Sequence, residues 1–191
     1  PSEKAIKLGK SLGRDPSFMQ LILDESNEIL STEKNVIIVE HKLGYININA
    51  GIDKSNISKN KDLVLLLPEN PKKSANDIQT QISSELDKDI SVIITDSMTR
   101  PYRSGVTNFA IASSNIQSLI DLKGEEDIFG NTLHATEIAI ADELAAAAGL
   151  LMGQGNDMKP VVIIKGFDRS NYSVNNAYDL IVNKDEDLYR F

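Results

Sequence analysis

The sequence contains no cysteine, so disulfide bonds, thiolate nucleophiles and cysteine-ligated zinc sites are all excluded. Tryptophan is absent as well, and aromatic residues make up only 5% of the 191 positions, so the core must be built from Ile, Leu, Val and Ala. The two histidines, His41 and His134, are too few for a poly-histidine metal site. A bound metal would therefore have oxygen ligands, which favours Mg²⁺, Mn²⁺ or Ca²⁺.

Basic residues are in deficit, and long apolar runs are missing. The chain has 28 acidic and 20 basic residues, and its net charge of −8 argues against a nucleic-acid partner. No apolar run is long enough to span a bilayer and no signal peptide is visible, so we expect a cytoplasmic protein without a membrane partner. Because the chain begins with Pro1 and enters a helical pattern at once, we also expect that an N-terminal segment is missing.

The apolar residues, in contrast, follow clear helical and strand patterns. Helices are predicted over residues 2–12, from Pro16 to include Ile29, from Ser74 to Leu86, and over 135–152 before Gly153. Strands are predicted at 35–40, 45–50, 63–68, 90–95, 107–112 and 160–166, the first two as a hairpin and those at 63–68 and 90–95 as buried strands. The expected fold is a mixed α/β domain covering residues 1–191, with helices packed on a sheet.

Three predicted elements end in small polar clusters, which are the main functional signal. The clusters are "NAGIDKSN" (49–56), "TDSMTRPYR" (95–103) and "MGQGND" (152–157). In α/β folds, ligands collect just beyond strand ends, because side chains from several elements converge there. We therefore expect the three clusters to form one oxygen-lined pocket.

Two aspartates in these clusters are candidate metal ligands. Asp96 and Ser97 offer a divalent cation a carboxylate beside a hydroxyl. The alternative is that Asp96 caps a turn and Ser97 bonds to the backbone. Asp53 has the same ambiguity, because its segment also fits a simple Asx turn.

The remaining polar residues suit anions. Arg100 and Arg103 bracket a Pro-Tyr turn and could hold a phosphate or a carboxylate, or they could form salt bridges to surplus acids. The backbone of the loop around Gln154 could approach a nucleotide, or Gly153 could be an ordinary helix stop. Carboxylates, hydroxyls, an amide and arginines together favour metal-assisted phosphoryl chemistry.

The motifs taken in order resemble one known family. "NAGIDKSN", "LLLPENP", "TDSMTRPYRSGVTNFAIA", "DLKGEEDIFGNTLHATEIAIADELAAAAGLLMGQ" and "PVVIIKG" resemble the coenzyme F420-0:L-glutamate ligase family, and the resemblance extends to about Gly166. It implies an α/β fold of the family's own type, in an intertwined homodimer. It also implies GTP-dependent addition of L-glutamate to coenzyme F420-0, with two Mg²⁺ or Mn²⁺ ions and an assisting monovalent cation such as K⁺.

The resemblance assigns roles residue by residue. It implies that Asp53, Asp96, Ser97 and Gln154 are metal ligands, and that Asn56 touches the nucleotide. The loop around Gln154 would line the nucleotide; it includes Gly153, Gly155 and Asn156. We expect Arg100 and Arg103 to hold an anionic group during catalysis. Two other functions stay open: a nucleotide- or deazaflavin-binding module without catalysis, and a metal-dependent phosphohydrolase.

Overall fold

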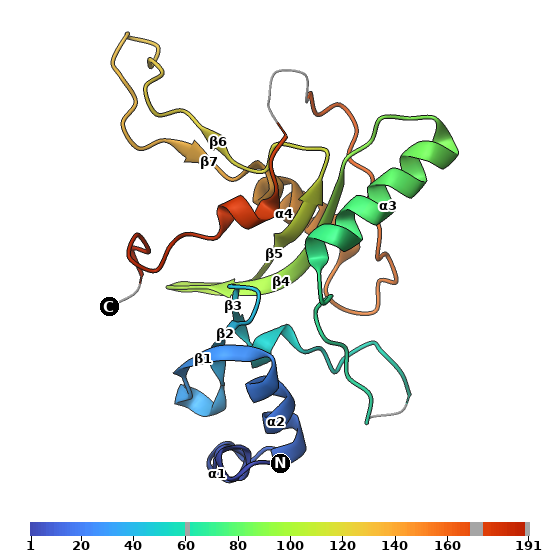
Figure 1. Cartoon of the computed structure of the whole chain (residues 1–191), viewed down its shortest axis with the longest axis vertical. Coiled ribbons are helices and arrows are strands. Elements are labelled where there is room, and N and C mark those ends of the chain that lie inside the picture. Colours follow the sequence, from blue (N-terminus) through green and yellow to red (C-terminus); the bar gives the residue numbers. More distant parts are fainter. Residues whose placement is uncertain (60–61, 169–173, 190–191) are drawn as a thin grey trace. The chain divides into compact units, whose positions relative to one another are not determined.

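The computed structural model describes residues 1–59, 62–168 and 174–189 (Figure 1). The chain divides into two compact units, each built from two stretches of sequence. Unit 1 comprises residues 1–67 and 98–105, and unit 2 comprises residues 68–97 and 106–191. Helices and small antiparallel sheets occur together, which confirms the mixed α/β class. The single domain over residues 1–191 and the homodimer stay predictions.

Unit 1 combines two helices with a three-stranded antiparallel sheet of order β1-β2-β3. Its elements are α1 (Glu3–Leu12), α2 (Pro16–Asp24), β1 (Ser26–Ser31), β2 (Ile38–His41) and β3 (Ile46–Ile48), with the short 3-10 helices η1 (Glu33–Asn35) and η2 (Asn49–Gly51). Nonpolar side chains from the helices and the sheet form one core, in which Met19, Ile22, Ile37 and Val39 are fully buried. This core fixes the position of the segment that leads to Asp53.

Local sequence signals explain most of these boundaries. Gly13 ends α1 in the left-handed conformation, with φ of 62°, as the sequence predicted. Asp15 caps α2 by accepting hydrogen bonds from the next turn, and Pro16 fills the first helical position. The predicted hairpin is confirmed as β2 and β3. The helical assignment of Ile29 is wrong, because Ile29 pairs with Val39 in the sheet.

His41, at the end of β2, is a buried titratable group in unit 1. Its Nδ1 accepts a hydrogen bond from the Leu43 backbone N–H (3.0 Å), so the neutral ring carries its proton on Nε2, which lies 3.5 Å from Glu25 Oε2. Burial lowers the pKa of His41, and the Glu25 carboxylate opposes that effect only in part. The folded unit therefore favours the neutral imidazole.

Unit 2 is built around the long hairpin of β4 and β5, whose tip at 98–105 belongs to unit 1. Its elements are α3 (Pro71–Leu86), β4 (Val92–Arg100), β5 (Arg103–Ser114), β6 (Ile120–Asp121), β7 (Glu137–Ile138), α4 (Ile140–Met152) and the 3-10 helix η3 (Ala177–Leu180). Helix α4 packs on the hairpin, where Ala141 of α4 and Ala110 of β5 share a small core with Ile93 of β4. Small side chains allow this close approach, and Ala145 of α4 is buried as well.

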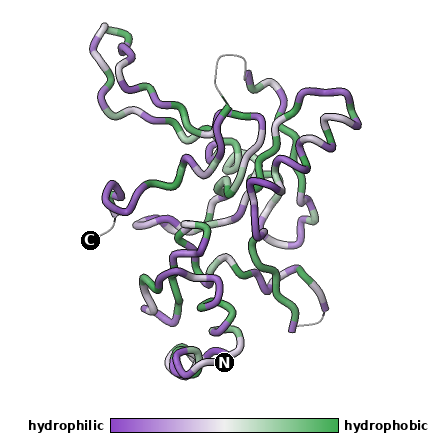
Figure 2. The backbone as a smooth tube through the Cα atoms, in the orientation of Figure 1, coloured by the Kyte–Doolittle hydropathy of each residue, from purple (hydrophilic) through white to green (hydrophobic). Residues whose placement is uncertain are grey.

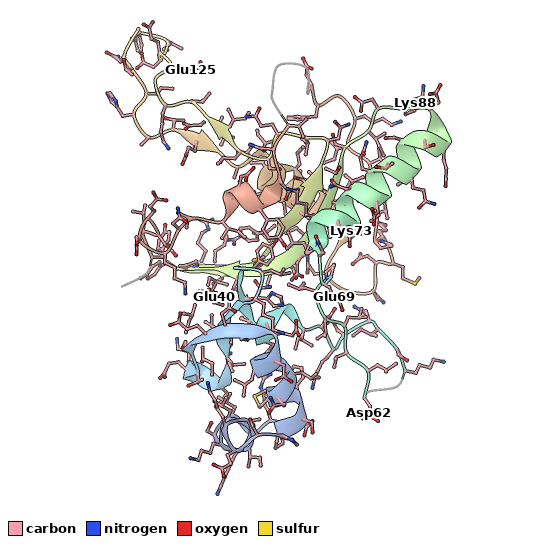
Figure 3. All side chains as sticks on the ribbon, in the orientation of Figure 1. Glu40, Asp62, Glu69, Lys73, Lys88 and Glu125 are labelled. Atoms are coloured by element: carbon pink, nitrogen blue, oxygen red, sulfur yellow. The ribbon has the colours of Figure 1, made fainter. Side chains whose placement is uncertain are left out.

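Two predicted helix starts in unit 2 are wrong. Helix α3 begins at Pro71 rather than after Ser74, because Asn70 caps it by accepting a hydrogen bond from the Lys73 backbone N–H (2.9 Å). Figure 3 labels Lys73 and Lys88 near the two ends of this helix. Helix α4 begins at Ile140 rather than near residue 135, because β7 pairs with β6 first. The loop between β6 and β7 carries Glu125, also labelled in Figure 3.

Two apolar runs differ from their predicted structure. Residues 63–67 and 161–164 carry the hydrophobic colour of the scale in Figure 2. The run at 63–67 forms only an isolated bridge, between Leu65 and Asp53, and the run at 161–164 forms no strand. Their side chains are largely exposed, with Leu65 at 55% and Val161 at 78%. Among the described residues, no helix has the length and apolar character needed to cross a membrane.

Candidate functional site

The loop after α4 positions Gln154. Gly153 ends the helix by donating its backbone N–H to Gly149 O (3.0 Å), and its φ of +75° lies in the region that favours glycine. A Cβ at position 153 would also lie 2.0 Å from Asp157 Oδ2, so the loop closes directly over this glycine. Asp157 Oδ2 also accepts a hydrogen bond from the Gly155 N–H (3.3 Å), within the same loop. The expected glycine helix stop is present, and the loop beyond it has a defined shape of its own.

A side-chain network attaches Gln154 to the hairpin. Gln154 Nε2 donates to Asn108 Oδ1 on β5 (2.8 Å), and Asn108 Nδ2 donates to Thr95 Oγ1 on β4 (3.4 Å). Gln154 itself is exposed, whereas Asn108 is buried. All three residues belong to unit 2, so their geometry is set within one compact body. The network brings Gln154 next to the strand that carries Asp96 and Ser97.

Asp96 and Ser97 follow Thr95 on β4. Side chains alternate along a strand, so Thr95 and Ser97 share the face that meets Asn108, and Asp96 starts from the opposite face. The Asp96 side chain nevertheless bends toward its neighbour, because Oδ1 accepts a hydrogen bond from the Ser97 backbone N–H (2.7 Å). Asp96 is half-buried and Ser97 is exposed. This bond to the backbone lies inside strand β4, which continues to Arg100, so it is not the turn cap that was the alternative to metal binding.

Helix α4 is anchored to the hairpin by a buried carboxylate. Asp142 Oδ1 accepts a hydrogen bond from the Ala110 backbone N–H on β5 (2.9 Å). Burial raises the pKa of Asp142, and the hydrogen bond from Ala110 offsets this only in part. This contact fixes the first turn of the helix against the strand that carries Asn108.

Asp53 lies in unit 1, whereas Asp96, Ser97 and Gln154 belong to unit 2. Its Oδ1 accepts hydrogen bonds from both the backbone N–H and the hydroxyl of Ser55 (2.8 Å each), which is the Asx turn that the sequence offered as an alternative. Its backbone pairs with Leu65. Asn56 follows with a left-handed φ of 55°. The predicted ligands thus divide between the units, and the expectation of one pocket for all three clusters stays a prediction.

Arg100 and Arg103 lie at the hairpin tip, in unit 1. Arg100 Nη2 donates to Ser104 O (3.4 Å), and its Nε is buried without a hydrogen-bond partner among residues 1–59, 62–168 and 174–189. Arg103 is exposed, and so is Tyr102 between them, with φ of 57°. Among the described residues of this unit, neither arginine forms the salt bridge that was the alternative to anion binding.

Comparison with known proteins places the chain in a family. Residues 1–166 match the sequence model of the F420-0:gamma-glutamyl ligases. The chain belongs to this family. It is 46% identical to the coenzyme F420:L-glutamate ligase of Methanocaldococcus jannaschii over 192 aligned residues, which cover all of this chain and 75% of the relative. Identity is 45% to the Methanococcus maripaludis enzyme of that name, with the same coverage of each chain. The Methanothermobacter thermautotrophicus enzyme of that name is 39% identical over 87% of this chain and 66% of its own length.

The oxygen atoms of the candidate ligands suit the divalent metal that the resemblance to this family implied. In unit 2, Asp96 supplies a carboxylate, Ser97 a hydroxyl and Gln154 an amide oxygen, which are hard donors of the kind that Mg²⁺ and Mn²⁺ accept. The described residues contain no cluster of three or more His, Cys, Asp or Glu side chains. A cation site here would therefore combine a carboxylate with neutral oxygens. The donor chemistry fits a hard divalent ion.

Sequence reasoning missed Asn108. Asn108 lies inside the strand predicted at 107–112, directly before an apolar run (109–112), and is only 7% exposed. A polar amide within an apolar strand was the available signal, because buried amides require partners. Its partner Gln154 is 46 residues away in the sequence, so the pairing emerges only from the fold.

Proposed function

We propose that this protein is a GTP-dependent ligase that joins L-glutamate to the deazaflavin coenzyme F420-0. The observation that carries the proposal is the family match over residues 1–166, together with relatives named coenzyme F420:L-glutamate ligase that align with the whole chain. The oxygen donors and the glycine loop of unit 2 support it, since phosphoryl transfer needs charge neutralisation and close backbone approach.

The proposed reaction has two steps. The terminal phosphoryl group of GTP passes to a carboxylate of F420-0, which gives GDP and an acyl phosphate. The neutral amine of glutamate then attacks the acyl carbon, the carbon–oxygen bond to phosphate breaks, and the new amide forms as the nitrogen loses a proton. Activation is needed because a free carboxylate is a poor electrophile toward an amine.

Individual residues have proposed roles in this scheme. Asp53, Asp96, Ser97 and Gln154 would hold two divalent ions, Mg²⁺ or Mn²⁺, which when bound would neutralise charge on the phosphates. Arg100 and Arg103 would hold an anionic group of a substrate. Asn56 and the loop residues Gly153, Gly155 and Asn156 would line the nucleotide. A K⁺ ion and a homodimer complete the proposal.

The direct test uses the full-length protein. It is incubated with GTP, Mn²⁺, L-glutamate and F420-0, and the products are followed by mass spectrometry and GDP release. A mass gain of one or more glutamyl residues that depends on GTP supports ligation. Release of GDP without glutamate and F420-0 identifies a phosphohydrolase, and binding without turnover identifies a non-catalytic module. Light scattering during size-exclusion chromatography tests the homodimer, and replacing K⁺ by Li⁺ tests the monovalent cation.

A pair of variants tests the role of the site carboxylate. Asp96→Asn removes one ligand charge, and we expect GTP-dependent ligation to fall by at least about tenfold. Asp77→Asn is the matched control, because the Asp77 side chain pairs with exposed Lys73 on α3 and with no other residue that the structure describes. Normal ligation by Asp96→Asn would overturn the assignment of Asp96 as a metal ligand.

A further inference from the structure

We propose that Asn108 is a positioning residue that orients the amide of Gln154 so that its oxygen, rather than its nitrogen, faces the metal. The inference rests on the proposed function, in which Gln154 is a metal ligand. Neither the sequence motifs nor the comparisons assign a role to Asn108. Its position in unit 2, beneath an exposed candidate ligand, carries the argument.

The hydrogen bonds set the direction of each amide. Gln154 donates through Nε2 to Asn108 Oδ1 (2.8 Å), so its own Oε1 is not used in that bond. Asn108 Nδ2 is directed away from Gln154, toward Thr95 Oγ1 (3.4 Å) and Met152 Sδ (3.7 Å). The Asn108 atom that faces Gln154 is an oxygen, which can only accept a hydrogen bond. Gln154 must therefore donate through its NH₂ group.

Packing keeps Asn108 in that orientation. Its side chain is 7% exposed and lies against Gly149 of α4. A Cβ at position 149 would be 2.8 Å from Asn108 Cγ, 3.0 Å from Oδ1 and 3.2 Å from Nδ2. The helix therefore approaches the amide as closely as a glycine permits, and Asn108 has little room to rotate.

This support matters because Gln154 is exposed and its amide could otherwise rotate freely. The two ends of a glutamine amide have nearly the same shape, but only the oxygen can bind a cation. An unsupported Gln154 would present its NH₂ group in part of its conformations. Partners that fix the orientation of a metal ligand typically change metal affinity about 10- to 100-fold when they are lost.

Binding of Mn²⁺ alone to the full-length protein tests this role. The free ion is measured by electron paramagnetic resonance, which gives the Kd and the number of sites independently of turnover. We expect Asn108→Leu to raise the Kd about 10- to 100-fold, and Asn108→Asp, which keeps an oxygen for Gln154, to retain the wild-type affinity or exceed it. Asn183→Leu is the matched control, because Asn183 is exposed and, within the described part of the chain, its side chain bonds only to Glu186.

The outcomes distinguish a positioning role of Asn108 from a merely structural role. They also distinguish failure of this inference from failure of the proposed metal role of Gln154. A merely structural role would lower the number of sites in Asn108→Leu and leave the Kd unchanged, which would overturn the inference. Asn108→Ser, which is too short to reach Gln154, replaces the Leu variant if the latter fails to fold. If Gln154→Ala weakens Mn²⁺ binding and neither Asn108→Leu nor Asn108→Ser does, the positioning role is wrong. If Gln154→Ala binds Mn²⁺ normally, the metal role in the proposed function is wrong.

Discussion

The close contact between Gly149 and Asn108 predicts that Gly149→Ala destabilises the wild-type protein but stabilises a variant that lacks the Asn108 amide. Ala is favoured over Gly in a helix interior by about 1 kcal/mol. At position 149, however, a Cβ would lie 2.8 Å from Asn108 Cγ, and overpacking of this kind costs about 1–3 kcal/mol. Gly149→Ala should therefore lower the free energy of unfolding by up to about 2 kcal/mol in the wild-type background.

Removing the opposing side chain should reverse that result. Asn108→Ala lacks the three atoms nearest to the new Cβ, so Gly149→Ala in this background should raise the free energy of unfolding by up to about 1 kcal/mol. The four proteins form a double-mutant cycle with an expected coupling of about 1–3 kcal/mol. Urea denaturation of the full-length proteins measures it. Equal effects of Gly149→Ala in both backgrounds would refute the packing described for Asn108.

Three further predictions concern stability. Burial raises the pKa of Asp142 above its ordinary 3.8, so the wild-type protein loses stability as the pH rises through the raised pKa. Asp142→Asn keeps an acceptor for the Ala110 N–H but cannot ionise. The free energy of unfolding of the variant relative to the wild type, measured by urea denaturation, should therefore be higher at pH 7 than at pH 4; a difference independent of pH would contradict this. Burial lowers the pKa of His41 from 6.5, so stability should fall as the pH drops below 6.5, and His41→Gln should remove part of that fall in thermal melts. A variant with the same pH profile as the wild type would exclude His41 as the cause. Asn70→Ala should cost about 1 kcal/mol by uncapping α3, whereas Ser74→Ala should change little, and the reverse ranking would contradict the start at Pro71.

The sequence predicted the fold best where neighbouring residues determine it. Asp15 and Pro16 start α2 through their own backbone chemistry, and Gly13 ends α1 in the same way. Ile29 was placed wrongly because β1 depends on pairing with β2, which lies further along the chain. The same reason explains the late start of α4, since Glu137 pairs with Asp121. Tertiary pairing overrides local helical patterns in these segments.

The candidate site shows the same division between local and distant information. Asp96 and Asp53 could be selected from the sequence, because a carboxylate beside hydroxyls stands out at the end of an apolar run. The sequence could also offer the Asx turn at Asp53, which the structure contains. It could not pair Asn108 with Gln154, because that contact requires the end of α4 to return to β5.

The interleaving of the two units limits how this protein can be divided for study. A single cut in the gene cannot isolate either unit, because the chain passes from one unit to the other after residues 67, 97 and 105. An expression fragment ending at residue 67 would omit the hairpin tip that completes unit 1. To isolate unit 2 for spectroscopy, one would start at residue 68 and replace residues 98–105 with a tight two-residue turn. Such a minimal protein would keep Thr95, Asn108 and Gln154 on one continuous polypeptide.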